Sequence, residues 1–134
     1  MGTLSYSPLA AGWLSGSWTK GPSPTSPTRR RLAARFDMSL PSNQRKLEVV
    51  ALLAGLAEDS GVSLIELAVG FVLSNPGVTS VIIGPRTMEQ LTTFLSTADA
   101  VLEDDILDRI DEVSTPGIAI NPMETDYGVV PASI

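Results

Sequence analysis

The sequence predicts an α/β protein built on a parallel sheet, and three observations support this fold class. Apolar runs alternate with stretches of helical periodicity, in the order strand, loop, two helices, strand, two helices and tail. The run Val78–Ile83 is β-branched and mostly apolar, as in a buried strand of a parallel sheet. Only two convincing strands are found, and two parallel strands leave two bare edges. We therefore expect two parallel strands and about four helices that form a piece of a larger architecture.

The first strand and its loop occupy residues 1–16. Leu4 to Leu9 have the composition of the end of a buried strand, and two glycines follow in the loop. Residues 17–41 hold four prolines and a run of arginines, which predicts a long loop with a short helical turn near Leu32–Phe36. Loops of this length inside compact proteins are usually functional.

Two helices are expected within residues 42–74. Apolar residues recur at helical spacing over 43–60, and Gly61 follows at the position of a left-handed C-cap. Ser63 and Glu66 then form a capping box that opens a helix over Leu64–Leu73. This second helix is apolar almost all round, so we expect it to be buried.

The second half of the chain repeats the strand and helix order. A strand over 78–84 leads through a short turn to Thr87 and Gln90, which are spaced as a second capping box. The helix they open runs to about Ala98, and an amphipathic helix follows over Leu102–Val113, so that helices fill 87–114. Residues 115–134 are expected to form an irregular tail.

Composition narrows the possible functions. The 134 residues are enough for one domain, and 43% of them are hydrophobic. Cysteine and histidine are both missing, which excludes disulfides, cysteine or histidine nucleophile systems and imidazole or thiolate metal sites. No apolar run approaches the ~20 residues of a membrane span, and the start does not resemble a secretory signal. We therefore expect a cytoplasmic protein that binds no metal and no membrane.

Charge is unevenly distributed along a chain of net charge −6. The segment from Lys20 to Lys46 holds seven of the nine basic residues, whereas Asp99 to Glu112 holds seven acids. The acidic block is interpreted as a solvated helix face. The run Arg29-Arg30-Arg31 is too short, and lacks the interleaved aromatics, to predict nucleic-acid binding.

Two motifs can hold a ligand. In the segment from Ile83 to Thr87 a strand ends, Gly84 permits close approach, and Arg86 precedes a helix N-terminus, which together make a phosphate cradle. The alternative is an ordinary turn with a surface arginine. The segment from Tyr6 to Gly12 follows a strand and offers an aromatic face, a hydroxyl and backbone amides, or else a core tyrosine and a turn. Both motifs in this order favour one site, since barrel enzymes often bind phosphate with the loops after their last two strands.

These motifs identify a resemblance. Tyr6-Ser7-Pro8-Leu9-Ala10 and the glycine-containing residues up to Gly16 resemble the segment after the seventh barrel strand of aldo-keto reductases. Residues 82–91 resemble their eighth strand and the turn that holds the adenosine phosphate. The resemblance covers about residues 4–115. It implies the C-terminal fragment of a (β/α)8 TIM barrel that reduces carbonyls with NADP(H).

The resemblance also implies roles for individual residues. Tyr6 would stack on the nicotinamide, and Ser7, Pro8, Leu9 and Ala10 would line the nicotinamide ribose and pyrophosphate. Gly84 and Arg86 would meet the 2′-phosphate end, and Gln90 would touch the adenosine. No catalytic residue is assigned, because the Asp, Tyr, Lys and His of the family belong to earlier strands, and Tyr127 lies in the tail.

Three departures from the family pattern predict weaker cofactor binding. Ser17 stands where many members have a lysine for the pyrophosphate, and Arg29, Arg30 or Arg31 are the candidates to replace it. Thr93 and Phe94 stand where many members have Glu-Asn for the adenine. We expect an inactive fragment that needs an N-terminal barrel half. The alternative is a non-catalytic module or truncated remnant that self-associates through its open sheet edges.

Overall fold

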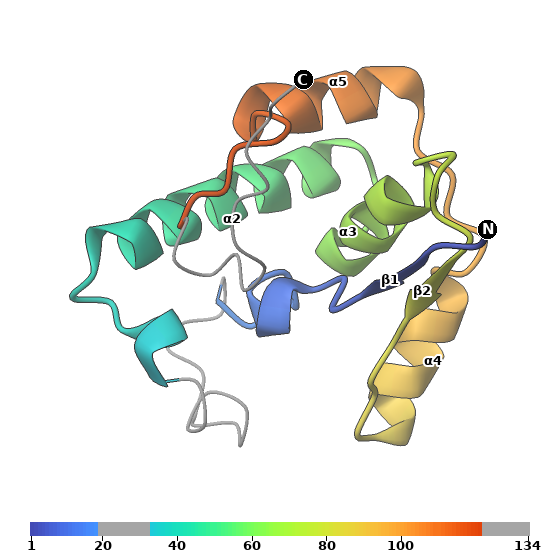
Figure 1. Cartoon of the computed structure of the whole chain (residues 1–134), viewed down its shortest axis with the longest axis horizontal. Coiled ribbons are helices and arrows are strands. Elements are labelled where there is room, and N and C mark those ends of the chain that lie inside the picture. Colours follow the sequence, from blue (N-terminus) through green and yellow to red (C-terminus); the bar gives the residue numbers. More distant parts are fainter. Residues whose placement is uncertain (19–32, 122–134) are drawn as a thin grey trace.

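The computed structural model describes residues 1–18 and 33–121 of the chain (Figure 1). This part contains two strands, two short 3₁₀ helices and four α-helices: β1 (Leu4–Tyr6), η1 (Ala10–Gly12), η2 (Ala33–Phe36), α2 (Pro41–Asp59), α3 (Leu64–Leu73), β2 (Ser80–Ile82), α4 (Met88–Ser96) and α5 (Asp104–Val113). The α/β class and the order of its elements are therefore confirmed. Arg29, Arg30, Arg31 and Tyr127 lie outside the described residues.

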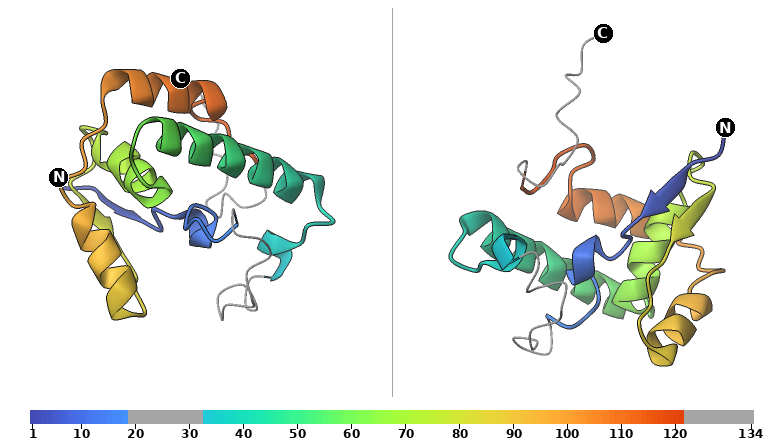
Figure 2. Two further views of the ribbon diagram at one scale, coloured as in Figure 1. Left: turned by 180° about the vertical axis from the view of Figure 1, so that it is seen from behind. Right: turned by 60° about the horizontal axis from the view of Figure 1, so that its bottom comes forward.

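The two strands pair in parallel, as predicted, with Leu4 opposite Ser80 and Tyr6 opposite Ile82 (Figure 2). The prediction that both strands are buried is wrong. Each strand is three residues long and alternates exposed, half-buried and exposed, so that Leu4 is 62% and Ile82 51% exposed. The reason is that no third strand of the described residues joins the sheet. Burial of an apolar strand depends on neighbours that its own composition does not supply.

The hydrophobic core lies among the helices. Helix α5 runs along α2, and α3 packs against both α2 and β2 (Figures 1 and 2). The core cluster consists of Trp13, Val49, Val50, Leu53, Leu56, Ala57, Leu64, Leu67, Leu102 and Ile110. None of these residues comes from β1, β2 or α4. The helical part therefore forms a core of its own, with the sheet at its side.

Local signals set the ends of α2 and α3. Gly61 has the left-handed φ of 71° predicted for a C-cap. The Ser63 amide donates to the Glu66 carboxylate at 2.7 Å, and the Glu66 amide donates to Ser63 Oγ at 3.1 Å, which confirms the first capping box. Helix α3 spans the predicted residues, but Phe71 is 43% exposed, so its outer face is not buried as expected.

The second capping box is only half confirmed. Thr87 Oγ1 accepts the Gln90 amide at 3.2 Å, as expected at the start of α4. The Gln90 side-chain oxygen, however, accepts the amide of Arg86 at 2.8 Å rather than that of Thr87. Through this hydrogen bond Gln90 holds the backbone of Arg86, the residue before the N-cap, in place.

Candidate cofactor site

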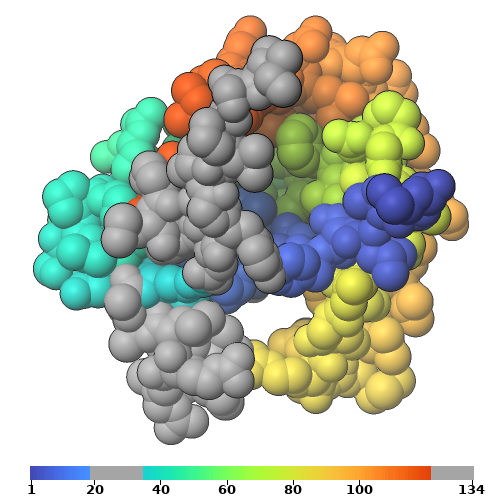
Figure 3. All heavy atoms as spheres, in the orientation of Figure 1, coloured from blue at the N-terminus to red at the C-terminus, as the bar shows by residue number. Residues whose placement is uncertain are grey.

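Parallel pairing brings the two sequence motifs together. Tyr6 and Ile82 are partners at the C-terminal ends of β1 and β2, so the segments that follow them leave the same edge of the sheet. A groove of about 820 Å³ lies between these segments, where the residues after β1 face those of α4 (Figure 3). Seven of the eight predicted cofactor residues line it: Tyr6, Ser7, Pro8, Leu9, Gly84, Arg86 and Gln90. Ala10 lies on the other side of its turn and lines a neighbouring pocket.

Tyr6 is the last residue of β1, and it is 66% exposed. This exposure excludes the alternative of a core tyrosine. Since the residue lines the groove, its ring offers an accessible face to a flat heterocycle.

The turn after β1 has a tightly constrained backbone. Ser7, Ala10 and Ala11 all have positive φ, at 57°, 48° and 59°. Such conformations cost of order 1–3 kcal/mol each for residues other than glycine, and they gather at functional sites. The Ala11 amide donates to Ser7 Oγ at 3.2 Å, and the Ala10 amide donates to the Ser7 carbonyl at 2.9 Å. Because the amides of Ala10 and Ala11 donate hydrogen bonds within the turn, other groups must bind an anion in the groove.

The second wall of the groove is the turn from β2 into α4. A Cβ added to Gly84 would meet no atom within 4 Å, so packing does not require glycine there and the backbone is open to the groove. Thr87 is the N-cap of α4, and the first amides of a helix have no partner inside it. Arg86 is exposed beside this helix N-terminus. Together these groups provide a cation and the positive end of a helix dipole.

The charges of the groove are few. Among its described lining residues Arg86 is the one cation, and Glu89 on the first turn of α4 is the one acid. Ser17 also lines the groove, and its hydroxyl lies 3.0 Å from that of Ser15. No lysine therefore occupies the position where the family pattern places one. Thr93 and Phe94 line the groove as well, and the Thr93 hydroxyl donates to the Glu89 carbonyl at 2.9 Å.

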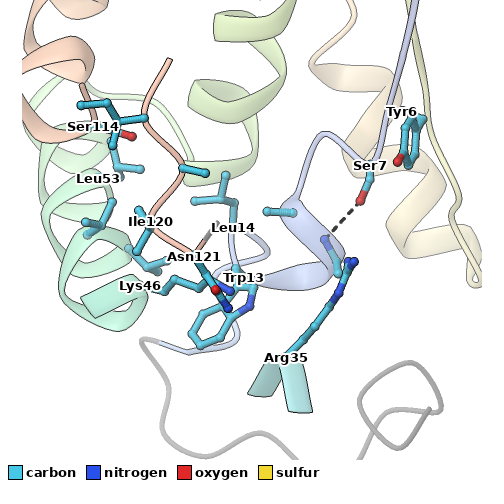
Figure 4. Close-up of a pocket in the computed structure, with 16 residues that line it drawn as sticks. Tyr6, Ser7, Trp13, Leu14, Arg35, Lys46, Leu53, Ser114, Ile120 and Asn121 are labelled. Carbon is cyan, nitrogen blue, oxygen red and sulfur yellow. Dashed lines mark hydrogen bonds between the residues drawn. The ribbon is translucent and has the colours of Figure 1, made fainter. Parts of the chain in front are cut away.

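A second pocket of about 680 Å³ adjoins the groove and shares Tyr6, Ser7 and Ala11 with it (Figure 4). Its charged lining residues are Arg35 and Lys46, which the sequence did not single out. Val50 and Leu53 belong to the apolar periodicity that predicts this helix, and Lys46 and Val49 share a face with them by helical spacing. No local pattern in the sequence indicates that η2 and the residues after α5 meet that face.

Among the described residues, two acidic side chains have pKa values that are clearly lowered, and both lie away from the groove. The Ser63 backbone amide and hydroxyl hold the pKa of Glu66 below its usual value. Hydrogen bonds from the side chain and backbone of Ser39 do the same for the pKa of Asp37. These carboxylates stabilise a helix start and a turn, so their shifts have structural causes.

Within residues 1–18 and 33–121, no group of three His, Cys, Asp or Glu side chains is placed to hold a metal ion. Within the same ranges no helix is both long and apolar enough to cross a membrane.

Paired strand ends, a glycine-arginine turn and a helix N-terminus along one groove are features of a nucleotide-binding α/β unit. The aldo/keto reductase family model matches residues 1–115, and the chain belongs to this family. A probable voltage-gated potassium channel subunit beta of Arabidopsis thaliana is 32% identical over 118 residues, covering 84% of this chain and 35% of the relative. The uncharacterized oxidoreductase YrpG of Bacillus subtilis is 32% identical, with 84% and 32% covered. Protein tas of Escherichia coli is 32% identical, with 82% and 31% covered. The chain thus spans about a third of the length of these relatives.

Proposed function

We propose that this chain is the C-terminal, NADP(H)-binding part of an aldo-keto reductase. The observation that carries the proposal is the parallel pairing of β1 with β2, which puts Tyr6 and Arg86 on one groove. The order of the two motifs and the match to the family over residues 1–115 support the same assignment.

The residues present fit the cofactor in part. The exposed ring of Tyr6 provides a stacking face for nicotinamide, and the turn residues Ser7, Pro8 and Leu9 border the ribose and pyrophosphate. Arg86 and the N-terminus of α4 meet the 2′-phosphate, since a guanidinium forms forked hydrogen bonds to phosphate oxygens. The Glu89 carboxylate repels a second anionic group in the groove, and Ser17 contributes no positive charge. We therefore expect weak binding that favours NADPH over NADH.

The chemistry of the whole reductase requires groups that this chain does not supply. A bound NADPH provides a hydride for carbonyl reduction, and a proton must come from an acid. The chain contains no histidine, and Tyr6 is assigned to the nicotinamide face. The residues of this chain therefore hold and orient the cofactor. We expect no carbonyl reduction from the chain alone.

The exposed sheet supports a partner for this chain. Leu4, Tyr6 and Ile82 are all more than half exposed, although their strands have the composition of buried ones. We propose that further strands of an aldo-keto reductase barrel pair with β1 and β2 and cover these side chains. Each 100 Å² of apolar surface covered in this way contributes about 2.5 kcal/mol.

Calorimetric titration of the full chain with NADPH and NADH tests the cofactor assignment. NADPH should bind about tenfold more tightly than NADH, because loss of a charge-assisted phosphate contact costs about 1.4 kcal/mol after allowance for exposure. Arg86→Ala should remove this preference while leaving NADH binding nearly unchanged. Arg45→Ala is the matched control, since Arg45 is an exposed arginine on α2 outside the groove, paired with Glu48 at 2.9 Å. Equal affinity of the wild type for both cofactors would refute the role of Arg86.

A second candidate function is a non-catalytic interaction module that self-associates through its sheet. The exposed apolar side chains of β1 and β2 favour it. Light scattering during size-exclusion chromatography separates the two proposals when it is combined with the titration. A stable oligomer that does not bind NADPH at millimolar concentration supports the interaction module. Binding of NADPH, with assembly only when the remaining barrel strands are co-expressed, supports the reductase part.

A further inference from the structure

The pocket beside the cofactor groove has the size and position of a ligand site. It measures about 680 Å³ and opens between η1, the N-terminal half of α2 and the residues that follow α5 (Figure 4). Pockets for small molecules usually measure ~300–1,000 Å³. Because it shares Tyr6, Ser7 and Ala11 with the groove, a molecule in it would lie next to the cofactor position proposed above.

Most of the wall is apolar. Trp13, Val49 and Val50 are between 4% and 5% exposed, and they belong to the hydrophobic core. Ile118 and Ile120, from the segment after α5, also line the pocket. This wall favours an apolar body such as an aromatic ring or a short alkyl chain.

The charged side chains of the pocket are all positive. Arg35 and Lys46 line it, and no described acidic residue does, although the chain as a whole carries a net charge of −6. Figure 4 shows Arg35 reaching toward the turn after Ser7 and Lys46 lying beside Trp13 and Asn121. Lys46 Nζ lies 5.5 Å from the centre of the Trp13 ring. The pocket therefore favours a negative group on the ligand, near Arg35 or near Lys46.

Both cations carry several N–H donors. Lys46 Nζ donates to Asn43 Oδ1 at 3.3 Å, and an ammonium group has three hydrogens. The Arg35 guanidinium has five N–H donors.

We propose that this pocket binds an apolar carboxylate, and that the carbonyl substrates of the reductase carry a carboxylate on an apolar body. The second half of this statement rests on the proposed function. The carboxylate meets Lys46, the apolar body lies against Val49, Val50 and Ile120, and the carbonyl points toward Tyr6.

Calorimetry on the full chain without cofactor tests the pocket, with 3-benzoylpropionate as the charged probe and its methyl ester as the neutral one. The carboxylate should bind about tenfold more tightly than the ester, and 0.5 M salt should reduce this preference. Lys46→Gln should bring the carboxylate to the affinity of the ester. Arg45→Gln, which removes the neighbouring exposed cation of α2, should leave both affinities unchanged.

A pocket-filling variant keeps the test valid if Lys46→Gln affects folding. Ala119 is exposed and lines the pocket, so Ala119→Phe should weaken both probes at least fivefold without disturbing the core. Equal binding of the two probes, no binding of either, or insensitivity to both variants would overturn the proposal. If the chain bound the carboxylate but not NADPH, the proposed pocket would be supported and the cofactor assignment rejected.

Discussion

Replacing Gly70 with alanine tests the packing of α3 in the hydrophobic core. A Cβ at position 70 would lie 2.9 Å from Leu102 Cγ and 3.2 and 3.3 Å from its two Cδ atoms. Leu102 is 6% exposed, so its side chain has little room to move away. Overpacking of this kind costs ~1–3 kcal/mol, whereas alanine gains ~1 kcal/mol over glycine within a helix. We expect Gly70→Ala to lower the free energy of unfolding by about 1 kcal/mol.

A double-mutant cycle with Leu102→Ala isolates the clash. Leu102→Ala alone should cost about 2–5 kcal/mol, because it opens a cavity in the core. With the Leu102 side chain shortened, Gly70→Ala should instead stabilise the protein by about 1 kcal/mol through helix propensity. The change of sign gives a coupling of about 2 kcal/mol.

Urea unfolding followed by circular dichroism measures the four members of the cycle, with sucrose present throughout to keep the weakest one folded. Gly55→Ala is the matched control, because Gly55 lies on the exposed face of α2 and an added Cβ meets nothing within 4 Å. It should stabilise the protein by about 1 kcal/mol. If Gly70→Ala stabilised the wild type by the same amount as Gly55→Ala, the packing of Leu102 on α3 would be refuted.

Three further predictions concern the caps and turns. Ser63→Ala should cost about 1 kcal/mol, measured by urea unfolding, because it removes the N-cap of α3. Glu66→Gln should destabilise the chain at pH 7. Since folding lowers the pKa of Glu66 below 4.5, its contribution is present above that value and is lost as the pH falls through the lowered pKa. The stability gap to Glu66→Gln should therefore close in acid, and a gap that widened would contradict the capping role. Ala11→Gly should raise the melting temperature, because glycine relieves the positive φ of 59°, and a fall would show that this conformation carries no strain.

Local chemistry explains which parts of the fold the sequence predicted. Helix α3 begins and ends where expected because its N-cap hydroxyl, its capping glutamate and the Asn-Pro-Gly that follows act within a few residues. Parallel pairing followed from the order of strands and helices. The gathering of Tyr6 and Arg86 on one groove followed in turn, because parallel strands end at the same edge of a sheet.

The errors arise where distant or competing partners decide. The strands are exposed because their burial depends on neighbours beyond the described sheet. Gln90 could accept either of two adjacent backbone amides, and it accepts that of Arg86. Packing between η2, α2 and the segment after α5 brings Arg35 and Lys46 to one pocket. Helical periodicity predicts the faces of a single helix, so it could not predict this contact between three segments.

The groove beside Tyr6 and Arg86 and the hydrophobic core are largely separate parts of this molecule. The groove is lined by β1, by the segment after it that contains η1, by Ile65 of α3, by β2 and the turn after it, and by α4. The core cluster includes no residue of β1, β2 or α4. The groove is held together by the strand pairing and by bonds between Thr3 and Thr79 at 2.8 and 3.0 Å, all near the surface. A ligand that bridges Tyr6 and Arg86 must therefore order the same strands that a covering strand would order. We expect cofactor binding and barrel completion to strengthen one another, since each reduces the entropic cost of the other.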